Sequence, residues 1–117
     1  MPKGSQASRL TDIVEACQRL RGLVADAPLE AVESDWQKQW LVERGVEIIS
    51  EASRHLTDEL KARHPQIPWR NVAGIDNVLR HEYERISAAV LWALVTIELP
   101  ALEQICRDEL AAAAREQ

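Results

Sequence analysis

The chain has 117 residues, which fits a single domain, and 46% of them are apolar, enough for a hydrophobic core. It contains no Phe and one Tyr but many Ala, Leu, Glu and Arg residues, so the composition favours helices over strands. The net charge of −5 argues against nonspecific coating of nucleic acid. No apolar run approaches the roughly 20 residues of a membrane helix, and the N-terminus lacks a secretory signal, so we expect a cytoplasmic protein without membrane association.

The first predicted helix is marked by apolar residues at three- and four-residue steps: Leu10, Ile13, Val14, Cys17, Leu20 and Val24. Pro28 ends this pattern, because proline is tolerated at a helix start but not inside a helix. Cys17 and the distant Cys106 both lie in helical patterns, so we expect two buried thiols rather than a disulfide. Without a CxxC or His/Cys cluster, the sequence predicts neither a metal nor a cofactor.

A second helical pattern runs over residues 29–63, which is long for a helix without internal caps. Ser34 followed by Gln37 matches a capping box, in which the two side chains bond each other's backbone N–H groups. We therefore expect a short helical turn before Ser34. A long helix should follow Asp35 and end at the His-Pro pair of residues 64–65.

Two features inside this long helix concern its packing. Gly45 costs about 1 kcal/mol relative to Ala in a helix, which predicts the close approach of a neighbouring helix. Trp36 and Trp40 stand one turn apart on one stripe. The sequence leaves open whether they belong to the core or to an interface with another molecule.

Two further helices follow. One should start at Pro68 and turn four side chains inward, namely Trp69, Val72, Ile75 and Leu79. It should stop near residues 83–87, where Ser87 is the predicted N-cap of the last helix. Pro100 lies inside that last pattern and should kink it. Four or five helices with short connections predict an all-α, up-and-down bundle, a single domain over residues 1–117 with an ordered core of about 8–110.

The third helix carries the residues with the most chemistry, which share one face by their spacing: Asn77, Arg80, His81 and Glu84. Histidine exchanges protons near neutral pH, and arginine can hold a phosphate. Together, without metal ligands, they suit cleavage of a phosphodiester by the 2′-hydroxyl of the substrate itself. The alternative is a solvated helix face, in which Asp76 and Arg80 form an ordinary salt bridge one turn apart.

The sequence around this face resembles the HepT-like branch of the HEPN superfamily. The similarity rests on IPWRNVAGI at residues 67–75 and NVLRHEY at residues 77–83. IISEAS at residues 48–53, Ile86, Trp92 and LPAL at residues 99–102 also fit, so the similarity spans roughly residues 8–110.

This resemblance implies a helical homodimer that acts as the toxin of a toxin–antitoxin pair. It implies a metal-independent endoribonuclease whose Arg-x(4–6)-His motif is gathered from both subunits in a cleft at the dimer interface. The implied antitoxin partner is a minimal nucleotidyltransferase of the MntA type. By position, His81 is the motif histidine, Asn77 the polar residue after the motif arginine, and Tyr83 the tyrosine that the antitoxin adenylylates.

One position departs from the family pattern. The motif arginine is expected five to seven residues before His81, where Asp76, Ile75 and Gly74 stand. A partly exposed aspartate at position 76 would repel a scissile phosphate by about 1 kcal/mol or more. Arg80 is the better substitute for the missing arginine, with Arg70 second.

The sequence is therefore compatible with three functions. The first is an RNase toxin with His81, Arg80 and Asn77 as catalytic residues and RNA as substrate. The second is a catalytically impaired dimeric module that binds a nucleotidyltransferase, because Asp76 stands where the motif arginine is expected. The third is an unrelated helical dimerisation domain.

Overall fold

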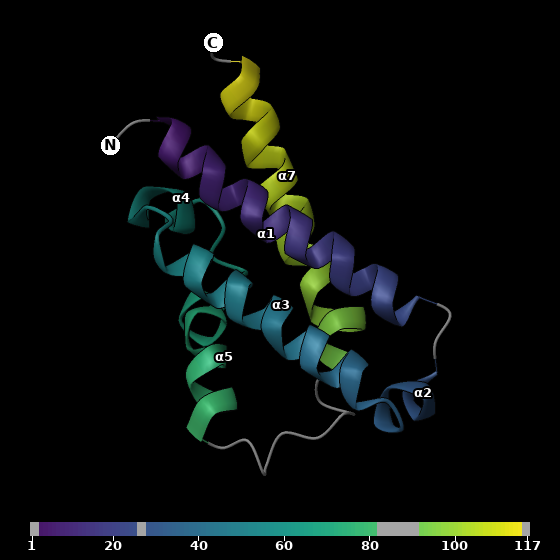
Figure 1. Ribbon diagram of the computed structural model, residues 1–117. Coiled ribbons are helices and arrows are strands. Elements are labelled where there is room, and N and C mark those ends of the chain that lie inside the picture. The colour runs from purple at the N-terminus through teal and green to yellow at the C-terminus, as the bar shows by residue number, and fades with distance from the viewer. Residues whose placement is uncertain (1–2, 26–27, 82–91, 116–117) are drawn as a thin grey trace.

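The computed structural model describes residues 3–25, 28–81 and 92–115, and within these ranges the backbone forms only helices and turns (Figure 1). The all-α prediction is confirmed. The elements are α1 (Lys3–Val24), α2 (Leu29–Glu33), α3 (Trp36–Arg54), α4 (Asp58–Ala62), α5 (Trp69–His81), the π-helical turn η2 (Leu94–Glu98) and α7 (Leu99–Arg115).

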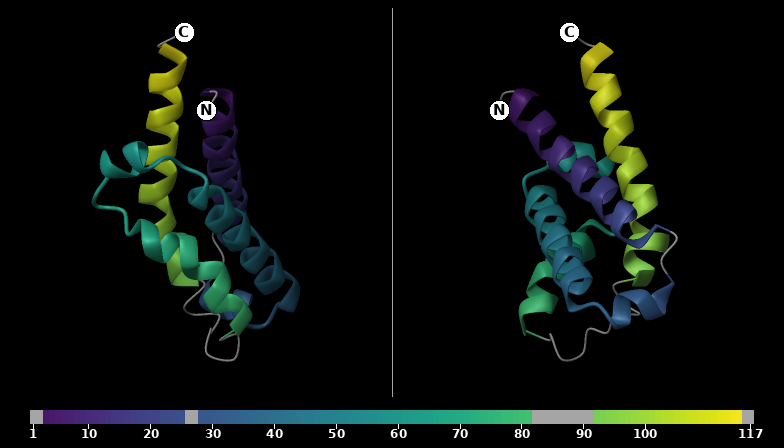
Figure 2. Two further views of the ribbon diagram at one scale, coloured as in Figure 1. Left: turned by 90° about the vertical axis from the view of Figure 1, so that its left-hand side faces the viewer. Right: turned by 45° about the vertical axis from the view of Figure 1, so that its right-hand side comes forward.

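The long helices reverse direction in succession, as an up-and-down bundle requires (Figure 1). Helix α1 packs against both α3 and α7, and α5 packs against the other side of α3. The first turn of α1 and the last turn of α7 lie at the same end of the molecule, and the last turn of α5 lies at the opposite end (Figures 1 and 2).

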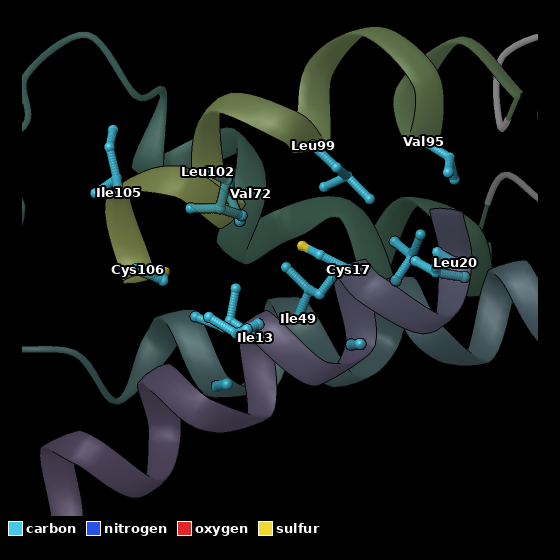
Figure 3. Packing of buried hydrophobic residues seen from close by; sticks show 14 of the residues in the cluster. Ile13, Cys17, Leu20, Ile49, Val72, Val95, Leu99, Leu102, Ile105 and Cys106 are labelled. Carbon is cyan, nitrogen blue, oxygen red and sulfur yellow. The ribbon is translucent and has the colours of Figure 1, made fainter. Parts of the chain in front are cut away.

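One hydrophobic core joins these helices, and Figure 3 shows side chains of α1, α3, α5 and α7 meeting within it. Cys17 of α1 and Cys106 of α7 are both buried there as free thiols. Burial raises the pKa of each thiol to about 12. The prediction of two buried, unpaired cysteines is therefore confirmed.

Gly45 lets α1 and α3 approach each other closely, as predicted. A methyl group at this position would lie 2.7 Å from Cδ2 of Leu20, a core residue that is 2% exposed. The contact explains why a residue of low helix propensity stands in the middle of α3.

The predicted boundaries of the second helical region were partly wrong. The short helix α2 precedes Ser34 as expected, but Asp35 rather than Ser34 caps α3, since its carboxylate accepts from the N–H groups of Gln37 and Lys38 at 2.9 and 3.2 Å. Helix α3 ends at Arg54, well before the predicted end at residues 64–65. Thr57 starts the separate helix α4 by accepting from Leu60 N–H at 3.1 Å, a side-chain cap that competes with continuing α3.

The last helical region contains a π-helical turn just before Pro100, the position where the sequence predicts a kink. Proline has no N–H to offer the carbonyl of Thr96, so the regular bonding pattern is interrupted there. Residues 94–98 adopt the wider π geometry directly before α7. The predicted N-cap, Ser87, lies outside the described residues.

Trp36 and Trp40 lie on the surface. They are 58% and 62% exposed, and their rings meet edge to face with centroids 4.7 Å apart. The interpretation of this pair as core is therefore wrong, because the inward face of α3 is formed by Val42, Val46 and Ile49. The alternative, an interface with another molecule, stays a prediction.

Candidate functional site

The face predicted to carry the chemistry belongs to α5. Asn77 is exposed on this helix, and the helical backbone continues through Arg80 to His81. The side chains of Arg80 and His81, and all of Tyr83 and Glu84, lie outside the described part of the chain. The gathering of Asn77, Arg80 and His81 on one face therefore stays a prediction.

Asp76, one residue earlier, is a structural residue that faces α3. It is 4% exposed, and its carboxylate accepts from Nη1 of Arg54 at 3.0 Å. Its backbone N–H donates to Oγ of Ser50 at 3.3 Å, and that hydroxyl donates to the carbonyl of Val72 at 2.7 Å. The expectation of a partly exposed aspartate was wrong, because the end of α3 provides a polar site that holds it.

Arg54 connects Asp76 to the surface of the molecule. Its Nη1 donates to the carbonyl of Ala73 at 2.7 Å as well as to Asp76. Its Nη2 donates to Glu51, whose second carboxylate oxygen lies 3.0 Å from Nε2 of His55. The hydrogen bond from Arg54, followed by that from His55, lowers the pKa of Glu51.

This cluster changes the electrostatic argument about position 76. A phosphate near α5 would meet a buried carboxylate already next to a guanidinium, so the expected repulsion is weakened. The Arg54 guanidinium is itself shared between two carboxylates, which makes it a poor replacement for the missing motif arginine. Arg80 remains the predicted substitute.

Sequence reasoning missed Ser50 and Arg54. Both lie on one face of α3 at the four-residue spacing of a helix, and Ser50 belongs to the IISEAS segment quoted above. Their partner on α5 is 22 to 26 residues away. A single sequence does not indicate which distant helix such a pair meets.

The side of α5 opposite Asn77 borders an apolar cavity of about 340 Å³. The cavity lies between α3, α5 and the start of α7, and its walls include Ile49, Val72, Ile75 and Leu99. This lining offers little to a phosphate or a metal. Among the described residues no group of three or more His, Cys, Asp or Glu side chains could hold a metal ion.

Comparison with known proteins identifies the family. The family model described as "Ribonuclease HepT-like" matches residues 13–109. The chain belongs to the HepT-like ribonuclease family. The resemblance stated from the sequence, over roughly residues 8–110, is thereby confirmed.

Two curated relatives illustrate the HepT-like match. "Probable ribonuclease HepT" of Thermococcus cleftensis is 35% identical over 101 residues, which cover 86% of this chain and 92% of the relative. "Putative RNase MJ1380" of Methanocaldococcus jannaschii is 28% identical over 104 residues, covering 89% of this chain and 95% of the relative. No solved structure gives a significant match. Over the ranges described, this HepT-like chain has no helix both long and apolar enough to cross a membrane.

Proposed function

We propose that this HepT-like protein is a metal-independent endoribonuclease. The observation that carries the proposal is the family match, which covers residues 13–109 and includes relatives named as ribonucleases. The surroundings of α5 are consistent with it, because Asn77 is exposed while the acidic residue beside it, Asp76, is buried against Arg54.

The reaction uses the 2′-hydroxyl of RNA as nucleophile. One His81 accepts the proton of this hydroxyl as its oxygen attacks the phosphorus, and the 5′-oxygen leaves. The His81 of a second copy, protonated, donates a proton to the leaving oxygen. Arg80 and Asn77 hold the phosphate and stabilise the charge that develops on it. The products are a 2′,3′-cyclic phosphate and a 5′-hydroxyl.

This mechanism needs a homodimer, in which two copies of His81 face one cleft. The exposed Trp36–Trp40 pair and the neighbouring Leu41, 53% exposed, support association with a second copy. Large apolar side chains that gather on a surface commonly mark an interaction site.

The biological role we propose is that of a toxin neutralised by a nucleotidyltransferase antitoxin of the MntA type. Transfer of AMP onto Tyr83 would add a negative charge and the bulk of an adenosine two residues from His81. Both would keep RNA away from the site. This part of the proposal rests on the family resemblance of the NVLRHEY segment at residues 77–83.

The deciding experiment is cleavage of a defined RNA by the purified protein in the presence of EDTA. We expect cyclic-phosphate products from the wild type and a loss of at least about 10²-fold with His81→Ala. His55→Ala is the matched control, since His55 is exposed and bonded to Glu51, and it should retain full activity. A wild type that cleaves no RNA and does not slow growth when expressed in a bacterial host would contradict the proposal.

A second candidate function is a non-catalytic module that binds a nucleotidyltransferase. It is favoured by the carboxylate at position 76, since Arg54 and Ser50 of α3 hydrogen-bond to Asp76. This alternative predicts that a nucleotidyltransferase co-purifies with the wild type and with His81→Ala alike, while neither protein cleaves RNA.

A further inference from the structure

Helix α5 rests on α3 through two kinds of contact. Val72 and Ile75 pack into the hydrophobic core, and apolar packing alone tolerates alternative arrangements. The polar contacts are directional and buried. Asp76 is one of the few buried charged residues in the described part of the chain, and Ser50 beside it is 0% exposed.

The polar contacts hold α5 at three residues of one face, Val72, Ala73 and Asp76. Ser50 bonds the carbonyl of Val72 and the N–H of Asp76, while Arg54 bonds the carbonyl of Ala73 and the carboxylate of Asp76. A rotation of α5 would break several of these bonds together. Buried polar groups of this kind can fix a single register at the expense of stability.

We propose that Arg54 is a positioning residue, which acts through Asp76 to fix the rotation of α5 and so keeps position 77 turned to solvent. This inference rests on the proposed function only in taking α5 as the helix that carries the catalytic residues. The aspartate at position 76 then has a role of its own in this protein, as the anchor by which α3 orients that helix.

Thiol labelling tests the rotation directly. Cys17 and Cys106 are buried, with pKa values near 12, so neither reacts while the bundle is folded. A thiol introduced by Asn77→Cys should react quickly with a disulfide reagent such as DTNB, because Asn77 is exposed. One introduced by Val72→Cys should react slowly, because Val72 is 9% exposed.

Replacing Arg54 should change this pattern. In an Arg54→Ala background we expect the Val72→Cys thiol to react about tenfold faster or more, while Cys17 and Cys106 stay unreactive. Arg44→Ala is the matched control, since Arg44 is an exposed arginine of the same helix that pairs with Glu47 three residues away, and it should change neither probe. If Arg54→Ala also makes Cys17 and Cys106 reactive, the bundle itself is loosened, and the milder Arg54→Lys replaces it. Lysine keeps the charge but not the planar guanidinium, so the Val72→Cys thiol should again react faster.

Exchanging the two charges tests whether the Arg54–Asp76 pair itself is responsible. Arg54→Glu combined with Asp76→Arg keeps opposite charges across the α3–α5 contact, and it should restore slow labelling of the Val72→Cys thiol. Unchanged labelling in the Arg54→Ala and Arg54→Lys proteins, or no rescue by the reversed pair, would overturn the inference.

The activity measurement separates this inference from the proposed function. If the protein cleaves RNA, Arg54→Lys should lower kcat while KM stays nearly constant, because displaced catalytic groups slow the reaction more than they weaken binding. If the wild type cleaves no RNA, the proposed function fails, while the labelling rates still decide whether Arg54 orients α5.

Discussion

At the scale of single residues, Asp76 shows how burial changes the meaning of a residue. In the sequence it stands where an arginine is expected, next to the residues predicted to bind a phosphate. In the structure it faces the opposite way from solvent and bonds Arg54 at 3.0 Å. The charge at this position therefore acts on the neighbouring helix α3.

The single substitution Asp76→Arg should therefore destabilise the protein instead of simply restoring a motif. It would place a second guanidinium beside Arg54, and we expect the free energy of unfolding to fall by about 2–4 kcal/mol. This is towards the low end of the cost of breaking a buried ion pair, because the Arg54 side chain is 38% exposed. Urea unfolding followed by circular dichroism measures this loss. A variant as stable as the wild type would show that position 76 is not held as described.

Gly45 permits a second prediction at this scale. Gly45→Ala gains about 1 kcal/mol of helix propensity but forces a methyl group against Leu20, and overpacking of a core costs about 1–3 kcal/mol. We expect a net loss of about 1 kcal/mol in urea unfolding. Gly22→Ala is the matched control, because no atom lies within 4 Å of the added methyl group, and it should gain stability. Equal effects of the two substitutions would refute the close contact.

At the scale of elements, the sequence predicted the helices better than their ends. Apolar spacing placed α1, α3, α5 and α7, since it follows directly from which face is buried. The end of α3 at Arg54 was missed, because Thr57 competes locally with a pattern that continues through it. The ion pairs between helices were also missed, since they join residues far apart in the chain.

One of these links joins α1 to α7. Both oxygens of Glu103 accept from Arg21 at 2.7 Å, and Arg107 donates to the same carboxylate at 2.9 Å. Burial of Glu103 opposes its charged form, but the hydrogen bonds from Arg21 and Arg107 outweigh burial and lower its pKa below the usual 4.5. A group with a lowered folded-state pKa stabilises the fold fully above its unfolded pKa and loses that effect as the pH falls through the folded value.

We therefore expect the free energy of unfolding to fall as the pH drops below about 4.5. Glu103→Gln should lower the free energy of unfolding by about 1–3 kcal/mol at pH 7, because two arginines are left without their shared carboxylate. It should also show a shallower acid decline than the wild type. Urea unfolding at several pH values between 7 and 3 measures both effects. Glu47→Gln, which alters an exposed pair with Arg44, is the control and should change little. Parallel pH profiles for the wild type and Glu103→Gln would contradict the assignment.

At the scale of the whole molecule, the fold class and family followed from the sequence, whereas the outer surface did not. The Trp36–Trp40 stripe satisfies the helical pattern of a core face, and only the arrangement of neighbouring helices shows that it is exposed. The catalytic roles predicted for Asn77, Arg80 and His81, and the modification predicted at Tyr83, stay predictions, since Asn77 is the only one of these four whose side chain lies in the described part of the chain.

The exposed tryptophans lead to a prediction about assembly. At about 60% exposure, the pair leaves on the order of 200–300 Å² of aromatic surface on one copy, a substantial part of the roughly 800 Å² per partner in a standard interface. We expect Trp40→Glu to weaken a homodimer about 30-fold or more in sedimentation equilibrium.

The matched control for this prediction is Ile97→Glu, which changes an exposed apolar residue on η2 that is 66% exposed. It should leave the dimer intact. Dissociation by Ile97→Glu but not by Trp40→Glu would place the interface elsewhere on the molecule.

The first turn of α1 and the last turn of α7 lie together, away from the last turn of α5 (Figure 1). An affinity tag, a fluorophore or a surface linker attached at either end would consequently extend away from the region where we place RNA cleavage. The protein can thus be immobilised through its termini for single-molecule or surface-based binding measurements while that region stays open to solution.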